Sequence, residues 1–380
     1  MSSRPAVQWL LAAVVVAGAA ARVAQFTATH SLDIDEAMIA LNIGTRSFAD
    51  LARPLDYGQT APVLFLWAER LVVALGGGEG GGMNAATLRL LPLLAGVALP
   101  LAVWRLANRF VEPRQALVAA ALTAVSPILL QYSRVAKPYE TDALVAVLLV
   151  SWAADTIAAP DHGATWLRLL AAGAVALCAS ASAVLVLAAI AAGLWWAQSH
   201  SGRRLAMAAL VWGGVFALHY VMLYRGVAEA PFMQQFWEAS FLTPTSLDVV
   251  PRAWVALQDV LSLAFVGSRA QPWGVVAFVA LAVAGTVSLA RPKRPWAAAL
   301  MAGPILAAVV ASALRRYPMA PRLMAFAVPL MACLLAAGIA ALAARVPRRG
   351  APWVFGLLVL AWLVPPGRAA VAGLGRRDVA

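Results

Sequence analysis

Long apolar runs recur along the whole chain, and most of them end in clusters of Arg, Pro or Gly. About 20 apolar residues in a helix are enough to cross the hydrocarbon core of a bilayer. The pattern therefore predicts an all-α integral membrane protein, a polytopic bundle of about eleven transmembrane helices in one domain, 1–380. The expected crossings are 6–24, 62–76, 86–108, 116–131, 143–158, 168–198, 204–224, 273–290, 296–313, 323–344 and 352–365.

The composition agrees with this pattern. Of the 380 residues, 63% are hydrophobic and only 12% are charged, whereas soluble domains carry about a quarter charged residues. The net charge of +12 does not indicate nucleic-acid binding, because the cations form short clusters between apolar runs rather than one polar face. Cys178 and Cys333 lie inside apolar segments without metal-ligand spacing, so neither a disulfide nor a cysteine metal site is expected.

Arg4 precedes the first apolar run and predicts a cytoplasmic N-terminus, with 6–24 as a retained anchor. A cleaved secretion signal is the alternative, because AGAAARVA resembles a signal-peptidase site. The acidic segment that follows then emerges on the outer side. The predicted outer loops are 25–60, which carries the candidate chemistry, and 225–272, which is rich in aromatic residues.

The run 168–198 is too long for one upright helix and slightly short for two. Counting it as one kinked crossing places the basic segments 133–137, 199–204 and 291–295 in the cytoplasm, as the positive-inside rule prefers. Under this count Arg134 and Lys137 are orientation signals. If 168–198 crosses twice and 62–76 does not cross, both residues move outside and join the site.

The stretch SLDIDEAMIALN, 31–42, places Asp33, Asp35 and Glu36 just after the first apolar run. Acids are scarce in this chain, so chemistry at the membrane face is the first hypothesis. One alternative is structural, because Asp33 and Glu36 have the spacing of a helix capping box. Another is a divalent metal held by Asp33 and Asp35, which could share one side of an extended segment. We expect no cofactor and rank that metal low.

A second charged cluster, ALRRYPMAPRLM at 313–324, falls on the outer face under the same count. Cations are normally scarce there, so Arg315, Arg316 and Arg322 around Tyr317 suggest a bidentate phosphate site. The alternative is contact with lipid headgroups. Outer acids facing outer arginines would suit an enzyme with a lipid-phosphate donor: a carboxylate takes the acceptor's proton, and the arginines stabilise the departing phosphate.

Five segments in order resemble the GT-C membrane glycosyltransferases of the protein-mannosyltransferase and lipid A aminoarabinose-transferase type. The acidic pair Asp35 and Glu36 opens the first outer loop as in that family. The other similar segments are DYGQTAPVLFLW from Asp56, ATLRLLPLLAG around Arg89, SPILLQYSRVAKPYETDAL at 126–144 and RRYPMAPRLMAFAVPL at 315–330. The family commonly has His or Lys near the position of Thr60 and Ala61, and this chain lacks it.

The resemblance implies GT-C-like outer loops and sugar transfer from a polyprenyl phosphate sugar, with inversion, to a lipid or cell-envelope glycan. It implies Asp35 as the base and an active site on the outer face of a bacterial inner membrane. Glu36 is the second candidate catalytic residue. Arg315, Arg316, Tyr317 and Arg322 are candidates for the donor phosphate. The supporting candidates are Asp33, Asp56, Gln59, Arg89, Arg134 and Lys137.

Two other function classes remain open. A transporter or lipid flippase would also have about eleven helices with buried charges, and it predicts functional charges at mid-membrane and an internal repeat. No obvious repeat or pair of broken helices is visible in the sequence. A binding-only subunit of an envelope complex would tolerate loss of the acids. No nucleic-acid partner is expected.

Overall fold

The structure is a computed structural model, and it describes residues 4–28, 31–76, 83–197, 202–244, 247–290 and 294–374. Within these ranges nine helices are long and apolar enough to cross a membrane, and two shorter apolar helices accompany them. The predicted polytopic helical bundle is confirmed, with eleven as an approximate count. The long helices are α1 (Arg4–Ala28), α5 (Leu90–Ala107), α8 (Tyr139–Ala158), α11 (Gly202–His219), α14 (Val249–Leu261), α15 (Pro272–Leu289), α16 (Pro295–Ala313), α17 (Val328–Ala343) and α18 (Ala351–Leu374), of which α11, α14 and α17 are extended by adjoining turns.

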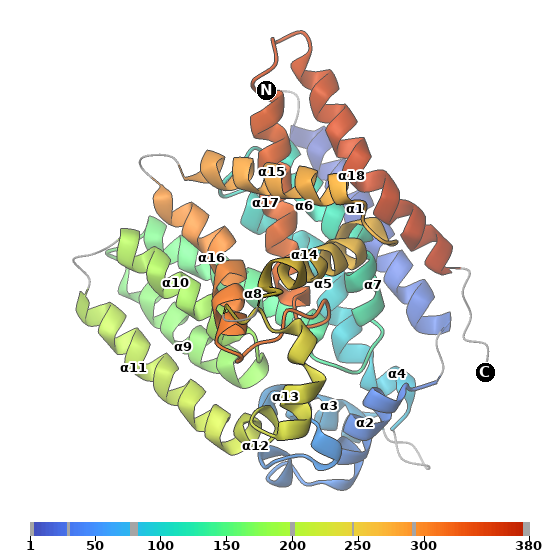
Figure 1. Ribbon diagram of the computed structural model, residues 1–380, viewed down its shortest axis with the longest axis vertical. Helices are drawn as coiled ribbons and strands as arrows, with labels where there is room; N and C mark the ends of the chain where they lie inside the picture. Colours follow the sequence, from blue (N-terminus) through green and yellow to red (C-terminus); the bar gives the residue numbers. More distant parts are fainter. Residues whose placement is uncertain are drawn as a thin grey trace.

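The short helices gather at one end of the molecule, which we call the site end (Figure 1, bottom). From there α5 leads away, and the chain returns through a helix broken at Ser126. The connections α5–α6, α8–α9, α10–α11 and α17–α18 form the opposite end. The short helices of the site end are α2 (Ile34–Thr45), α3 (Val63–Leu75), α4 (Ala85–Leu88), α12 (Arg225–Ala228) and α13 (Pro231–Phe236); the broken helix is α6 (Pro113–Val125) with α7 (Pro127–Tyr132).

Helix α17 is the most deeply buried of the long helices, with 83% of its span inside the protein. It packs closely against α15, and two glycines make this approach possible. A side chain at Gly285 would collide with the carbonyl of Leu334, and one at Gly338 with the carbonyl of Leu281. Because membrane helices gain little from hydrophobicity alone, such close backbone contacts supply much of their packing energy.

The prediction of one kinked crossing over 168–198 is wrong. The structure has two helices there, α9 (Gly163–Ala179) and α10 (Ala183–Ala197). Ser180 and Ser182 lie at the break, buried, with their hydroxyl oxygens 3.1 Å apart. Serine side chains that bond locally compete with helical hydrogen bonds, so this small-residue stretch ends one helix and starts the next.

The segment 62–76 does not cross the bundle, although the hydropathy pattern predicts that it does. Helix α3 has 13 residues and is about 20 Å long, shorter than a bilayer core of about 30 Å. Both ends lie at the site end, because Arg89, soon after α3, bonds to Glu36. Glu69 is fully buried, and burial raises its pKa to about 9, so this carboxyl is protonated at neutral pH.

Because 62–76 does not cross, the turn 133–138 lies at the site end, where the amide of Ala136 donates to Glu36. The prediction that Arg134 and Lys137 lie on the opposite side of the membrane from the acidic segment is therefore wrong, and the alternative count is the one that the structure follows. The predicted second outer loop, 225–272, is largely helical and contains α13 and α14. The basic segments 199–204 and 291–295 lie partly outside the described residues, at 199–201 and 291–293.

Candidate functional site

Asp33 caps helix α2. Its carboxylate accepts a hydrogen bond from the Glu36 amide at 2.7 Å, and the Glu36 carboxylate accepts one from the Asp33 amide at 3.1 Å. This reciprocal pair is the capping box that the sequence spacing suggested. The cap fixes where the helix begins, and so it fixes the direction in which the next residues point.

Glu36 is buried, and both of its carboxylate oxygens accept hydrogen bonds. Arg89 donates two of these bonds, Nε to Oε1 at 2.8 Å and Nη2 to Oε2 at 2.6 Å. The Ala136 amide donates to the same Oε1 at 2.7 Å. Burial by itself would raise the pKa of Glu36, but these hydrogen bonds outweigh it and hold the pKa below its ordinary value. Glu36 thus joins the acidic loop to α5 and to the turn at 133–138.

Asp35 points away from this clamp toward the late arginine cluster. Its Oδ2 lies 3.2 Å from Nη1 of Arg322, with side-chain exposures of 45% and 31%. No described residue donates to its other oxygen, Oδ1. The guanidinium of Arg322 also lies 4.8 Å from the ring centroid of Trp237, a cation–π contact. The structure therefore brings an acid of the first loop and an arginine 287 residues later to one place.

Lys137 lies beside the same pair, buried to 7% exposure. Its Nζ donates to Oε1 of Gln59 at 2.6 Å. Burial lowers the pKa of Lys137, while the carboxylates of Asp35 and Asp33 act in the opposite direction. Burial removes water from the Lys137 ammonium, and a buried charge is unfavourable unless it is paired. An anionic group of a ligand would therefore stabilise the charged form of Lys137.

Two tyrosines complete the neighbourhood. The ring centroids of Tyr132 and Tyr139 are 4.7 Å apart. Both hydroxyls interact electrostatically with Arg322. Sequence reasoning did not single out these tyrosines. Their position could have indicated them, because they lie on either side of the SRVAK turn, within one of the segments that resemble the glycosyltransferase family.

Arg315 and Arg316 do not converge on Asp35. Arg315 forms an ion pair with Glu238 at 2.5 Å, from a left-handed backbone conformation with φ of 56°. Arg316 lies 3.6 Å from Glu229. Tyr317 is also engaged, because its hydroxyl donates to the Leu323 carbonyl at 2.6 Å. The two arginines join the 229–238 segment to the 315–323 turn, and Tyr317 bonds within that turn.

The remaining candidates lie at the edge of the site. Asp56 is exposed and bonds to Arg46 at 2.9 Å, and Arg134 lies in the same turn as Lys137. No group of three His, Cys, Asp or Glu side chains suited to a metal occurs among the described residues. Asp33 and Asp35 start a helix, where residues two apart do not face each other, so the extended arrangement that could share a metal is not present.

One buried ion pair was missed by sequence reasoning. Arg22 of α1 and Glu140 of α8 are both fully buried, 3.6 Å apart. Arg22 also donates to the carbonyl of Ala124, at the end of α6, at 3.1 Å. In the structure, helix α1 continues to Ala28. Arg22 is therefore inside the helix, whereas the apolar pattern placed it at the flank.

Comparison with known proteins agrees with this architecture. Residues 60–224 match the family model for dolichyl-phosphate-mannose-protein mannosyltransferases. No curated protein sequence matches the chain.

Among solved structures, the oligosaccharyltransferase of Archaeoglobus fulgidus, crystallised with Zn and sulfate, is similar over 97% of this chain, with 15% identity and a TM-score of 0.63. ArnT from Cupriavidus metallidurans, bound to undecaprenyl phosphate, is similar over 98%, with 16% identity and a TM-score of 0.57. The match covers 53% of the first protein and 76% of the second, so this chain spans about half the length of the oligosaccharyltransferase. The fold of this chain, a bundle with membrane-length helices, is therefore similar to the fold of these two proteins.

Proposed function

We propose that this protein is an inverting glycosyltransferase that moves a sugar from a polyprenyl phosphate sugar to a lipid or cell-envelope glycan. The observation that carries the proposal is the contact between Asp35 and Arg322, with Lys137 beside them. The same place then offers a carboxylate and two cations, which is what the displacement of a phosphate by a hydroxyl requires. The structures of similar fold that hold undecaprenyl phosphate or dolichol-phosphate support a lipid-phosphate donor.

Asp35 acts as the general base in this proposal. Its Oδ1 is available to an acceptor hydroxyl, and its Oδ2 is held by Arg322. The acceptor oxygen attacks the anomeric carbon of the donor while its proton passes to Asp35. The bond from that carbon to the phosphate oxygen breaks, and polyprenyl phosphate leaves with the electron pair. Attack from the face opposite the leaving group inverts the anomeric centre.

Arg322 and Lys137 bind the donor phosphate and stabilise the charge that grows on it as the bond breaks. An arginine can hold two phosphate oxygens at once, and a lysine adds a compact charge. Arg315 and Arg316 instead hold the 229–238 segment against the 315–323 turn through Glu238 and Glu229. Glu36 is a positioning residue, because its oxygens are already occupied by Arg89 and Ala136.

Replacing Arg322 with alanine should weaken binding of polyprenyl phosphate about tenfold or more, since a hydrogen bond to a charged group contributes roughly 1.5–3 kcal/mol. Binding can be measured by titrating the purified protein with a short-chain polyprenyl phosphate. Arg316→Ala, which removes an equal charge from a residue paired with Glu229, should change the affinity less than about twofold. An equal loss of affinity in both variants would favour the phosphate site of three arginines that the sequence suggested.

The site end is proposed to face the outside of a bacterial inner membrane. The opposite end carries more arginines than acids among the described residues, and positive charge is enriched in cytoplasmic loops. Its acids are Glu112, Asp155 and Asp161, and its arginines are Arg105, Arg109, Arg114, Arg168, Arg203, Arg204, Arg345, Arg348 and Arg349.

Cysteine labelling tests this orientation. Single cysteines at Ser31 and Met319, in a protein lacking Cys178 and Cys333, should react with a membrane-impermeant maleimide applied to cells with a permeable outer membrane. A cysteine at Arg349 should react only after the inner membrane is opened. Protection of Ser31 or Met319, together with labelling of Arg349 in intact cells, would place the site in the cytoplasm and contradict the proposed orientation.

The experiment that tests the function is a comparison of envelope glycolipids from cells with and without the protein. Mass spectrometry should show at least one glycolipid that gains the mass of a sugar only when the active protein is present. Cells that express Asp35→Asn at the same level should lack this species. Identical glycolipid and glycan profiles in all three cell types would remove the support for a transferase.

A transporter or flippase is the alternative, because Arg22 and Glu140 are charges inside the bundle. Both side chains are fully buried, and Arg22 is bonded to backbone carbonyls at the end of α6. Charges that serve a transport path normally line a water-filled cavity. The buried ion pair of Arg22 and Glu140 therefore favours a structural role, joining α1, α6 and α8, over a path for substrate.

A further inference from the structure

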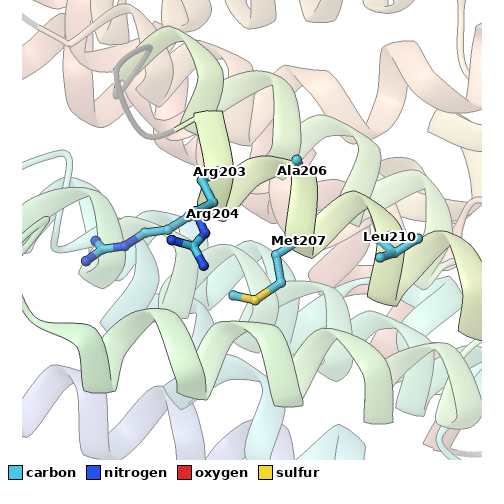
Figure 2. A pocket seen from close by; sticks show the side chains of 5 residues that line it. All are labelled: Arg203, Arg204, Ala206, Met207 and Leu210. Atoms are coloured by element: carbon cyan, nitrogen blue, oxygen red, sulfur yellow. The ribbon is translucent and has the colours of Figure 1, made fainter.

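A cavity of about 580 Å³ lies against the first turns of α11, at the opposite end of the bundle from Asp35. Its lining residues form a row along the helix, with two guanidinium groups at one end, Met207 in the middle and Leu210 at the other end (Figure 2). The chemistry proposed at the site end uses none of them. The full lining is Arg203, Arg204, Ala206, Met207 and Leu210.

The cationic end of this groove is held in place without a carboxylate. Arg204 donates to the carbonyl of Pro160 at 2.8 Å, and its guanidinium lies 5.7 Å from the ring centroid of Trp166. No described carboxylate lies within ion-pair distance of Arg203 or Arg204, whereas the nearby Asp155 is shared by two other arginines. Two positive charges therefore face the surface without a counter-ion from the described part of the protein.

The rest of the groove is apolar and exposed at the protein surface. Met207 is 48% exposed and Leu210 is 77% exposed. The row from Arg203 to Leu210 rises about 10 Å along the helix. On the other face of α11, Trp212 packs against Gly173 of α9 and donates to the carbonyl of Leu170 at 3.0 Å. The groove thus has a cationic end and an apolar wall along one face of α11.

We propose that this groove binds an anionic membrane phospholipid, with its phosphate on Arg203 and Arg204 and the upper part of an acyl chain along Met207 and Leu210. The charge complementarity selects a phosphate, and the apolar wall selects a lipid over a free phosphate ion. The indole N–H of Trp166, which is buried and has no acceptor among the described residues, lies under Arg204 in the same corner. This groove is separate from the proposed donor site, because it lies at the other end of the bundle.

Native mass spectrometry of the whole protein released from nanodiscs tests this proposal. The nanodiscs contain equal amounts of phosphatidylglycerol and phosphatidylcholine with the same acyl chains. We expect the wild type to retain one phosphatidylglycerol preferentially. The double variant Arg203→Ala/Arg204→Ala should reduce this retention about tenfold, because each arginine near a membrane surface contributes to anionic-lipid binding.

The matched control is Arg348→Ala/Arg349→Ala, which removes the same charge from the exposed α17–α18 turn at the same end. It should retain phosphatidylglycerol as the wild type does. Met207→Trp keeps both arginines but fills the apolar wall, and it should also lower retention. The proposal is overturned if both double variants lose the lipid equally, if Met207→Trp has no effect, or if 50 mM inorganic phosphate displaces the lipid.

Discussion

Replacing Asp35 with asparagine is expected to lower the rate of sugar transfer by about 10² or more, with donor affinity changed far less. Asparagine has nearly the same shape as aspartate but cannot take a proton from the acceptor hydroxyl, and general-base catalysis contributes about 10²–10⁴. The measurement is release of polyprenyl phosphate from purified enzyme, under single-turnover conditions with saturating donor. Because Asp35 is 45% exposed and makes only one ion pair, the variant should fold normally.

Asp50→Asn provides the matched control. Asp50 lies in the same loop, is 47% exposed and also pairs with an arginine, Arg53, at 3.2 Å. It does not contact Arg322 or Lys137, so transfer should stay within about twofold of the wild type. A rate in Asp35→Asn equal to that in Asp50→Asn would exclude Asp35 as the base. A large loss of donor affinity in Asp35→Asn, with an unchanged chemical step, would assign it to binding instead.

The location of the candidate base could be predicted from the sequence because the signal is local. Asp33, Asp35 and Glu36 follow an apolar run directly, and the capping-box spacing alone explains how Asp33 and Glu36 bond to each other. The meeting of Asp35 with the late arginines was also predicted, although only Arg322 makes the contact. Such a prediction needs only the side of the membrane on which each segment emerges.

The path between these segments was harder to predict. Hydropathy measures whether a segment is apolar, and it does not show whether the chain continues or turns back. The run 168–198 contains a helix break at Ser180, and the apolar segment 62–76 remains at one end of the bundle. Removing the crossing at 62–76 changes the side of 133–137, and the additional crossing at 168–198 keeps the later segments on the sides first assigned to them. This is why Lys137 was first placed in the cytoplasm.

Partners that lie far apart in the sequence were not predictable from residue type. Arg89 and Glu36 are 53 positions apart, and Arg315 and Glu238 are 77 apart. One sequence shows that each charge needs a partner near a membrane, but it does not show which one. The consequence was that three arginines were assigned to one phosphate, whereas two of them are held by acids of the 229–238 segment.

Breaking the buried pair of Glu36 and Arg89 is expected to destabilise the protein by about 3–5 kcal/mol, because the remaining partner keeps an uncompensated buried charge. The variants are Glu36→Gln and Arg89→Met, and both side chains are almost fully buried in the wild type. The free energy of unfolding in mild detergent micelles is measured by denaturant titration. The exposed pair of Arg53 and Asp50 is the control, and Arg53→Met should cost roughly 1 kcal/mol or less.

The double variant separates the ion pair from the packing around it. If the two charges stabilise each other, Glu36→Gln with Arg89→Met should cost less than the sum of the single variants, because neither charge is left alone. Additive losses would show that Glu36 and Arg89 act independently, and the clamp between α2, α5 and the 133–138 turn would then not depend on their bond.

The single variants should also transfer sugar more slowly, because Asp35 is no longer held in position, and saturating substrate should not restore the wild-type rate. The ion pair of Glu36 and Arg89 would then account for both the stability and the position of the base, since it fixes the helix on which Asp35 lies.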